Sequence, residues 1–192
     1  MARLNVNPNR MELSRLKKRL VVAKRGHKLL KDKQDALIKA FLERAREGKV
    51  LREELESELA ECYKSFLLAR AQTLPAMLEQ ALMISGAKCD LHVGMQNVMS
   101  VLVPVYSVEQ GGSPVNYGLA TSLGSLDVAL ERFAALIPRL IALAAKEKAI
   151  NLMAVEIEKT RRRVNALEHV LIPGFVETIR YITMKLDEQE RS

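Results

Sequence analysis

The side chains that most often carry out chemistry in proteins are few in this chain and far apart. Three histidines (His27, His92 and His169) and two cysteines (Cys62 and Cys89) are spread over its length. A zinc site needs several such ligands at short spacings, and the sequence has no such group. A catalytic nucleophile needs a base within hydrogen-bonding reach, and no set of residues indicates one. We therefore expect no catalytic, cofactor-binding or metal-binding residues.

Nucleotide-binding loops are also missing from the sequence. Neither the GxxxxGK[ST] pattern, which cradles phosphates, nor GxGxxG occurs. His27 and Cys62 fall on apolar stripes of the predicted helices, which favours ordinary interface positions over a ligand or a base. Cys89 stands at the head of the predicted hairpin, and we interpret it as a residue without a chemical role.

Positive charge is concentrated at one end of the chain. Residues 1–47 hold 14 Lys and Arg against 5 Asp and Glu, residues 48–125 hold 5 against 8, and residues 126–192 hold 11 against 10. Such a basic segment is typical of a helix face in contact with solvent, of a surface that binds a nucleic-acid backbone, or of a surface that binds an acidic protein. Proteins that recognise nucleic acid usually combine a basic patch with aromatic side chains or a known motif, and this segment has neither.

Residues 9–84 carry an apolar stripe with alternating steps of three and four. This spacing, with charges on the other faces, predicts a long helix that packs along another helix, and Asn9 is a suitable cap for its start. The steps of four at Leu51–Leu55–Leu59 form a stutter, which locally unwinds a supercoil. The stripe consists of Leu13, Leu16, Leu20, Ala23, His27, Leu30, Gln34, Leu37, Phe41, Leu51, Leu55, Leu59, Cys62, Phe66, Ala69 and Thr73.

The middle of the chain, residues 85–124, is rich in glycine and poor in charge. Apolar residues alternate there with period two from Leu91 to Val105, which predicts strands. We expect a turn at Gly111 and Gly112, with the return strand at residues 115–119. Pro104 cannot donate a ladder hydrogen bond and so predicts an edge strand. The simplest interpretation is a short β-hairpin inserted between helices.

Residues 125–190 resume the helical spacing and predict a second long helix. Two long helices joined by a reversing insert should pack antiparallel, so we expect an all-α-dominated fold, a single elongated domain over residues 1–192. Pro75, Pro138 and the pair Pro173-Gly174 should kink or interrupt their helices. The second stripe consists of Leu126, Leu130, Phe133, Ile137, Leu140, Ile150, Met153, Ile157, Thr160, Val164, Leu167, Leu171, Phe175, Ile182 and Leu186.

Targeting and membrane signals are absent from the sequence. The first 19 residues alternate charge with leucine rather than forming the apolar run of a signal peptide. No segment reaches the roughly 20 apolar residues that a membrane helix needs. We therefore expect a cytoplasmic protein without direct membrane insertion.

Two long segments resemble a known family. NVNPNRMELSRLKKRLVVAKRGHKLLKDKQDALI (Asn5–Ile38) is similar to the N-terminal signature of the D subunit of V-type ATPases, and EIEKTRRRVNALEHVLIPGFVETIRYITMKLDE (Glu156–Glu188) is similar to its C-terminal signature. MSVLVP (Met99–Pro104) resembles the middle segment of the same family. The three segments cover a third to a half of the chain, in the order in which the family has them.

The resemblance implies a central rotor shaft. Its terminal helices would form a left-handed coiled coil inside the ring of A and B subunits, where ATP is handled. The F subunit would bind along its side, and its lower part would seat on the subunit that caps the membrane ring. Cations of both terminal helices would then contact the ring. The candidate contacts are Arg10, Lys17, Lys18, Arg25, Lys28, Lys31, Arg161, Arg162 and Arg163.

Two other functions remain open from the residues alone. A stand-alone coiled-coil scaffold or adaptor explains the apolar stripes but not the two signatures. A helical protein associated with nucleic acid explains the basic end but predicts no ATPase partners. A gel shift sensitive to salt, without ATPase association, would favour the nucleic-acid interpretation.

Overall fold

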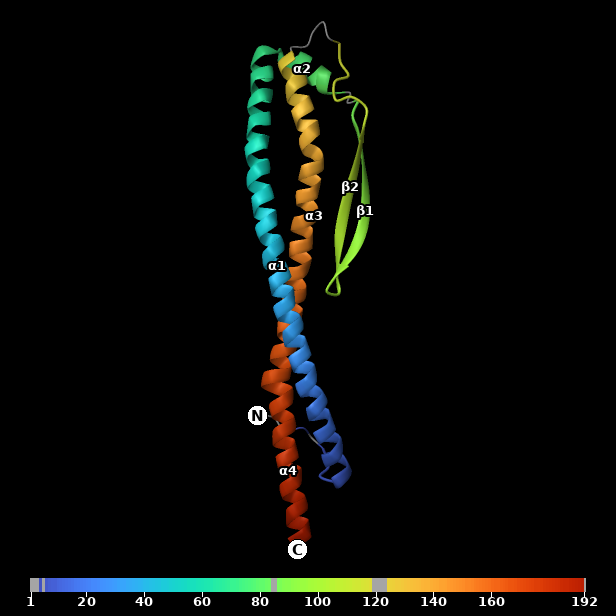
Figure 1. The fold of residues 1–192 in the computed structure, drawn as a ribbon, viewed down its shortest axis with the longest axis vertical. Helices are drawn as coiled ribbons and strands as arrows, with labels where there is room; N and C mark the ends of the chain where they lie inside the picture. Colours follow the sequence, from blue (N-terminus) through green and yellow to red (C-terminus); the bar gives the residue numbers. More distant parts are fainter. Residues whose placement is uncertain (1–3, 5, 84–85, 119–123, 192) are drawn as a thin grey trace. The chain divides into compact units, whose positions relative to one another are not determined.

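The computed structural model describes residues 4, 6–83, 86–118 and 124–191. Its elements are α1 (Arg10–Gln72), α2 (Pro75–Leu82), β1 (Lys88–Val98), β2 (Val101–Gly111), α3 (Gly124–Ala166), the π-helical segment η1 (Leu167–Leu171) and α4 (Ile172–Arg191), as Figure 1 shows. The helix-dominated fold, with α1 packed along α3 and a hairpin between them in sequence, confirms the predicted class. The single domain over residues 1–192 stays a prediction.

Contacts group the chain into two compact units, which are described separately below. Unit 1 comprises Met1–Ala40 and Met153–Ser192, and unit 2 comprises Phe41–Leu152. Each unit therefore combines a stretch of α1 with a stretch from the C-terminal half of the chain. No helix in the described parts of the chain combines the length and apolarity that crossing a membrane requires.

The ends of α1 follow from side chains near them. The Oδ1 atom of Asn9 accepts a hydrogen bond from the backbone N–H of Glu12 at 2.7 Å, which confirms the predicted cap. The helix continues through Gly48 and ends at Gln72. Leu74 has the extended backbone that a residue before proline adopts, and Pro75 is the first residue of α2. Pro75 thus interrupts the predicted helix 9–84, whose last residue lies outside the described ones.

The core of unit 1 is the predicted apolar stripe. All eight stripe positions from Leu13 to Leu37 are buried or half-buried, and Leu16 and Leu37 are almost fully buried. Met153, Val164 and Ile182 supply buried side chains from the C-terminal helices. Burying side chains of this size is worth about 1.5–3 kcal/mol each. The spacing of apolar residues therefore explains how these helices pair.

The described residues of unit 2 include two small apolar clusters. One contains Leu55, Cys62 and Leu136, and the other contains Ala69, Leu78 and Leu126. Cys62 is buried, as its position on the stripe predicts. Leu59 and Phe133 are also stripe positions but are 39% and 46% exposed. Leu59 ends the stutter, where the unwinding of the stripe turns a side chain away from the helix interface.

The hairpin turns at a different place from the one predicted. β1 pairs antiparallel with β2 from Lys88↔Gly111 to Val98↔Val101, so that Met99 and Ser100 form a two-residue turn. Both have positive φ, 52° and 70°. The predicted turn at Gly111-Gly112 is wrong, since residues 112–118 contain no strand and residue 119 lies outside the described ones. Turns of this kind usually contain Asn-Gly or Asp-Gly, so Met-Ser gave no signal.

The other two helix prolines are accommodated in different ways. α3 continues through Pro138 without interruption. Pro173 follows the π-helical segment, where the N–H of Ile172 donates to the carbonyl of Leu167, five residues earlier. The α-helical turns of α3 thus hold Pro138, whereas a wider turn precedes Pro173. The same turn moves Leu171 off the predicted stripe, and its side chain is 41% exposed.

Candidate partner-binding surface

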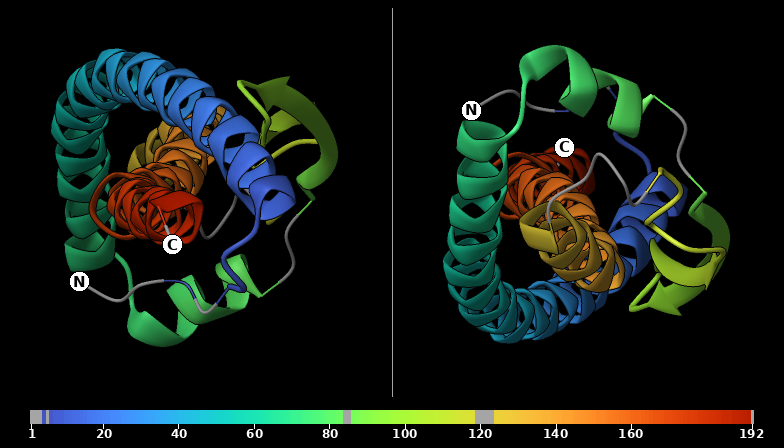
Figure 2. Two further views of the ribbon diagram at one scale, coloured as in Figure 1. Left: turned by 90° about the horizontal axis from the view of Figure 1, so that it is seen from below. Right: turned by 90° about the horizontal axis from the view of Figure 1, so that it is seen from above.

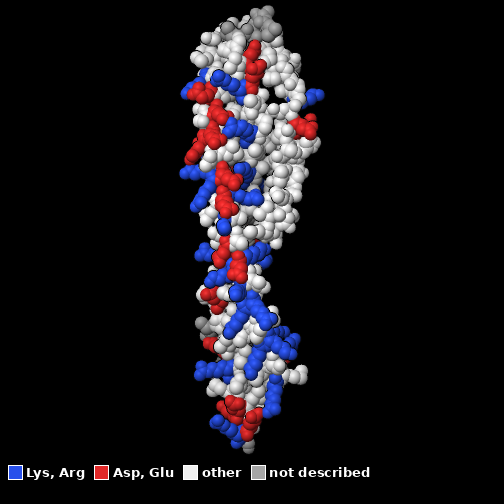
Figure 3. Space-filling view, in the orientation of Figure 1, with Lys and Arg blue, Asp and Glu red and all other residues white. Residues whose placement is uncertain are grey.

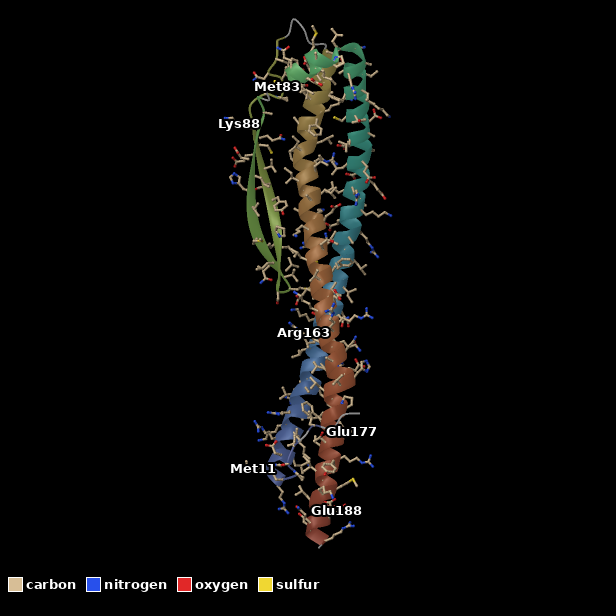
Figure 4. All side chains as sticks on the ribbon, turned by 180° about the vertical axis from the view of Figure 1, so that it is seen from behind. Met11, Met83, Lys88, Arg163, Glu177 and Glu188 are labelled. Atoms are coloured by element: carbon tan, nitrogen blue, oxygen red, sulfur yellow. The ribbon has the colours of Figure 1, made fainter. Side chains whose placement is uncertain are left out.

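All nine predicted contact residues belong to unit 1 and are exposed. Arg10, Lys17, Lys18, Arg25, Lys28 and Lys31 lie on α1, and Arg161–Arg163 lie near the end of α3. Unit 1 thus brings the two predicted basic groups into one compact body. In Figure 4, Met11 and Glu188 mark the end of this unit where α1 begins and α4 finishes.

Only two of these nine cations are paired within the described residues. Arg10 forms an ion pair with Glu190, and Arg162 pairs with Glu158 one turn earlier on the same helix. The remaining seven form no ion pair with any described carboxylate. They are Lys17, Lys18, Arg25, Lys28, Lys31, Arg161 and Arg163. Their charge is therefore presented to solvent or to another molecule.

Unit 2 uses its cations differently. Arg139 of α3 binds both Glu54 and Glu58 of α1, and its Nη2 atom lies 3.1 Å from the Oε2 atom of Glu54. Lys146 reaches Glu47 at 3.2 Å across the same helix pair. These contacts connect the two helices and neutralise charge within the unit. Three cations of unit 2, the third being Arg52 with Glu147, thus pair between helices, whereas Arg10 is the one predicted contact of unit 1 that does so within the described residues.

The two units consequently differ in net charge. Residues 1–40 and 153–192 hold 19 Lys and Arg against 10 Asp and Glu, a net charge of +9, whereas residues 41–152 hold 11 against 13, a net charge of −2. In Figure 3, blue side chains dominate much of unit 1, whereas red and blue alternate along the helices of unit 2. A net charge of this size attracts an acidic partner over several ångströms.

His27 occupies the interface position that its spacing predicts. Its side chain is 20% exposed, and its Nε2 atom lies 3.2 Å from the Oε2 atom of Glu168 in η1. The contact links α1 to the π-helical segment inside unit 1. His92 and His169 do not join it, and no group of three or more possible metal ligands is present among the described residues. That part of the chain therefore brings together no set of side chains with metal-site geometry.

Sequence reasoning missed an apolar groove in unit 2. It encloses about 250 Å³ between α1 and α3. Leu59 and Phe133, the two exposed stripe residues of unit 2, form part of its wall. The remaining lining is Cys62, Tyr63, Phe66, Ala129 and Leu130. The stutter at Leu59 was the one sequence signal that could have indicated it.

Comparison with known proteins gives a consistent result. The family model for the D subunit of ATP synthase matches residues 12–192. The V-type ATP synthase D subunit of Thermoanaerobacter sp. (strain X514) is 53% identical, over 100% of this chain and 93% of the relative. The D subunit of Clostridioides difficile (strain 630) is also 53% identical, over 100% and 88%. That of Clostridium botulinum (strain Langeland) is 50% identical, over 99% and 90%.

These matches extend well beyond the two terminal signatures and include the hairpin and the helices of both units. The family model begins two residues after the start of α1 and runs to the last residue. By this full-length similarity and by its fold, the chain belongs to the family of ATP synthase D subunits.

Proposed function

We propose that this chain is the central rotor shaft of a V-type ATPase, and that it couples ATP hydrolysis or synthesis in the A and B ring to rotation and ion transport. It carries no active site in this proposal. The relatives are named as subunits of V-type ATP synthases, which supports membership of such a complex. The complex would hold it on the cytoplasmic side, peripheral to the membrane.

The observation that carries the proposal is the set of seven exposed cations of unit 1 without a partner in the described chain. Unit 2 pairs Arg52, Arg139 and Lys146 with carboxylates between its helices, whereas the described part of unit 1 supplies no carboxylate for these seven cations. An acidic sleeve formed by the A and B subunits would supply the missing carboxylates. Ion pairs at such an interface chiefly fix orientation and speed association.

Coupling follows from contacts that change with shaft angle. Each A–B interface would meet a different face of unit 1, and its affinity for nucleotide would depend on which face it meets. The angle of the shaft and the state of the nucleotide are then linked free energies, so that each biases the other. The F subunit along the side and the subunit capping the membrane ring would carry the rotation onward.

Reversal of charge tests the proposed contact. The variant with Lys17→Glu, Lys18→Glu and Lys28→Glu changes three exposed side chains of α1 that are unpaired in the described chain. Purified A and B subunits would be mixed with this variant, and assembly would be measured by size exclusion and by ATPase rate. We expect affinity for the ring to fall about tenfold or more at roughly 50 mM salt, with a smaller difference at roughly 500 mM.

A matched control places the same charge change in unit 2. Arg46→Glu, Arg70→Glu and Lys148→Glu also reverse three exposed cations of helices that are unpaired in the described chain, and they should leave ring binding within about twofold. Equal losses in both variants would reduce the effect to net charge and contradict a specific contact. Failure of the unaltered chain to bind A and B at all would overturn the shaft proposal. Recovery of nucleic acid would then support the alternative interpretation.

A further inference from the structure

Pro138 leaves one carbonyl of α3 without its usual helical donor. In a regular helix the N–H of residue 138 would bond to the carbonyl of Ala134, and proline has no such hydrogen. The Nε2 atom of Gln110, at the end of β2, donates to this carbonyl at 2.8 Å. A side chain of the hairpin thus occupies the position that the proline vacates.

The hairpin lies against the rest of unit 2 along β2. Val103 and Val101 of β2 are 2% and 7% exposed, whereas β1 is exposed along its length except at Val98. Two strands alone form no core, so other elements must cover these valines. Both views place α3 between the hairpin and the unit 2 part of α1 (Figures 1 and 2).

The base of the hairpin is a close contact between two glycines. Gly112 has φ +79°, and a Cβ atom added to it would stand 2.1 Å from the carbonyl oxygen of Gly86. Only glycine fits there, both for the backbone conformation and for the space. The two ends of the hairpin therefore meet in a backbone contact, with the side chain of Asn116 beside Gly86. Contacts farther along the strands, such as that of Gln110, add to the position of the hairpin.

We propose that Gln110 and the carbonyl released by Pro138 form a latch that holds the hairpin on α3. Breaking this bond lets the hairpin move away as a unit, pivoting at the Gly86–Gly112 base while its strands stay paired. The latch is a property of unit 2 and holds whether or not the chain acts as a rotor shaft. In this view the helix proline is an attachment point rather than a kink.

Thiol labelling of the full chain measures this movement. The chain has two cysteines, Cys62 in the helix interface and the exposed Cys89. In a Cys89→Ser background, the near-isosteric change Val103→Cys places a thiol under the docked hairpin. Its labelling rate reports the fraction of time the hairpin is open, and Cys62 reports opening of the helices. Gln110→Ala and Pro138→Ala are then introduced separately and together.

We expect each single change to accelerate labelling at position 103 by about two- to fivefold, since a hydrogen bond of this kind contributes modestly. Cys62 should label at an unchanged rate. The double variant should label no faster than either single variant. Alanine at position 138 restores the helical donor to the carbonyl of Ala134. The hydrogen bond from Gln110 is then already lost, so removing the Gln110 side chain has no further effect. The control Ser107→Ala, an exposed polar residue of the same hairpin, should have no effect.

A second measurement separates the latch from helix stability. Pro138→Ala should slow hydrogen exchange in α3 near residue 138, because a helix gains a donor, while the hairpin thiol becomes more reactive. Unchanged labelling in both single variants would overturn the latch. Multiplied increases in labelling rate in the double variant would also overturn it. An equal increase in the labelling rate of Cys62 would overturn it as well, because the hairpin would then open only together with the helices.

Discussion

Gly48 of α1 lies directly against Ile150 of α3. A Cβ atom on Gly48 would stand 3.3 Å from the Cδ1 atom of Ile150, tighter than ordinary contact. The glycine is buried in the middle of a 63-residue helix, where its lack of a side chain lowers helix propensity. It therefore brings two helices of unit 2 close together at a cost to the stability of one of them.

Replacing Gly48 should have opposite effects for small and large side chains. Gly48→Ala should raise the free energy of unfolding by about 0.5–1 kcal/mol, because the flexible end of Ile150 can shift and the helix gains propensity. Gly48→Leu should lower it by about 1–3 kcal/mol by forcing the helices apart. Urea titration followed by circular dichroism measures both, and a loss in the alanine variant would show that Ile150 cannot move.

Arg139 should contribute to the stability of unit 2 through its two carboxylate partners. Arg139→Ala is expected to lower the free energy of unfolding by about 0.5–1 kcal/mol, because the side chain is 37% exposed and water screens the pairs. Arg139→Lys should recover only part, since an ammonium group does not fork between Glu54 and Glu58. The difference should shrink in roughly 1 M salt.

A control for that prediction is Arg162→Ala, which removes an ion pair within one helix. Its effect on unfolding should stay near about 0.3–0.5 kcal/mol, typical of pairs one turn apart. A loss as large as that of Arg139→Ala would mean that the connection between helices adds nothing.

Thr178 should hold the N-terminal segment onto α4. Its hydroxyl donates to the carbonyl of Gly174 at 2.7 Å and accepts the backbone N–H of Leu4 at 3.1 Å. Thr178→Val keeps the shape and removes both bonds, so we expect a loss of about 1–2 kcal/mol and faster proteolysis near the N-terminus. Thr178→Ser keeps the hydroxyl and should retain the protection. Equal cleavage in the two variants would contradict this role.

Tyr117 should make unit 2 sensitive to alkaline pH. Burial, together with a hydrogen bond to Asp127, raises the pKa of its hydroxyl well above the ordinary value of 10.0. The unfolded chain loses this proton first, so the contribution to stability is complete below about pH 10 and is lost as pH rises toward the folded pKa. Tyr117→Phe should flatten the decline in unfolding free energy above about pH 10, and an unchanged slope would contradict it.

The features predicted best from the sequence are those set by local patterns along the helices. The apolar stripe of α1 in unit 1, the cap at Asn9 and the interruption at Pro75 each depend on neighbours within a few residues, so a local pattern carries them. The family resemblance then indicated which class of protein has these helices. The basic residues were identified by type, but sequence alone could not say which of them find an internal carboxylate.

The features that were missed depend on contacts between distant segments. Met99 and Ser100 adopt positive φ because the strands on either side pair in that register, although neither residue favours such a turn. Gln110 meets Ala134 across 24 residues, and no spacing rule connects a strand glutamine with a helix proline. A local rule that links a helix proline to a π turn also fails, since Pro173 follows such a turn and the proline inside α3 is accommodated without one.

The contacts between α1 and the C-terminal helices also imply an order of folding. Ser125 meets Gln72 across 53 residues, His27 meets Glu168 across 141, and Arg10 meets Glu190 across 180. Short loops close with less loss of entropy, so pairing should start beside the hairpin and proceed toward both termini. During synthesis on the ribosome, the basic start of α1 therefore waits, without its helical partner, until α4 has emerged.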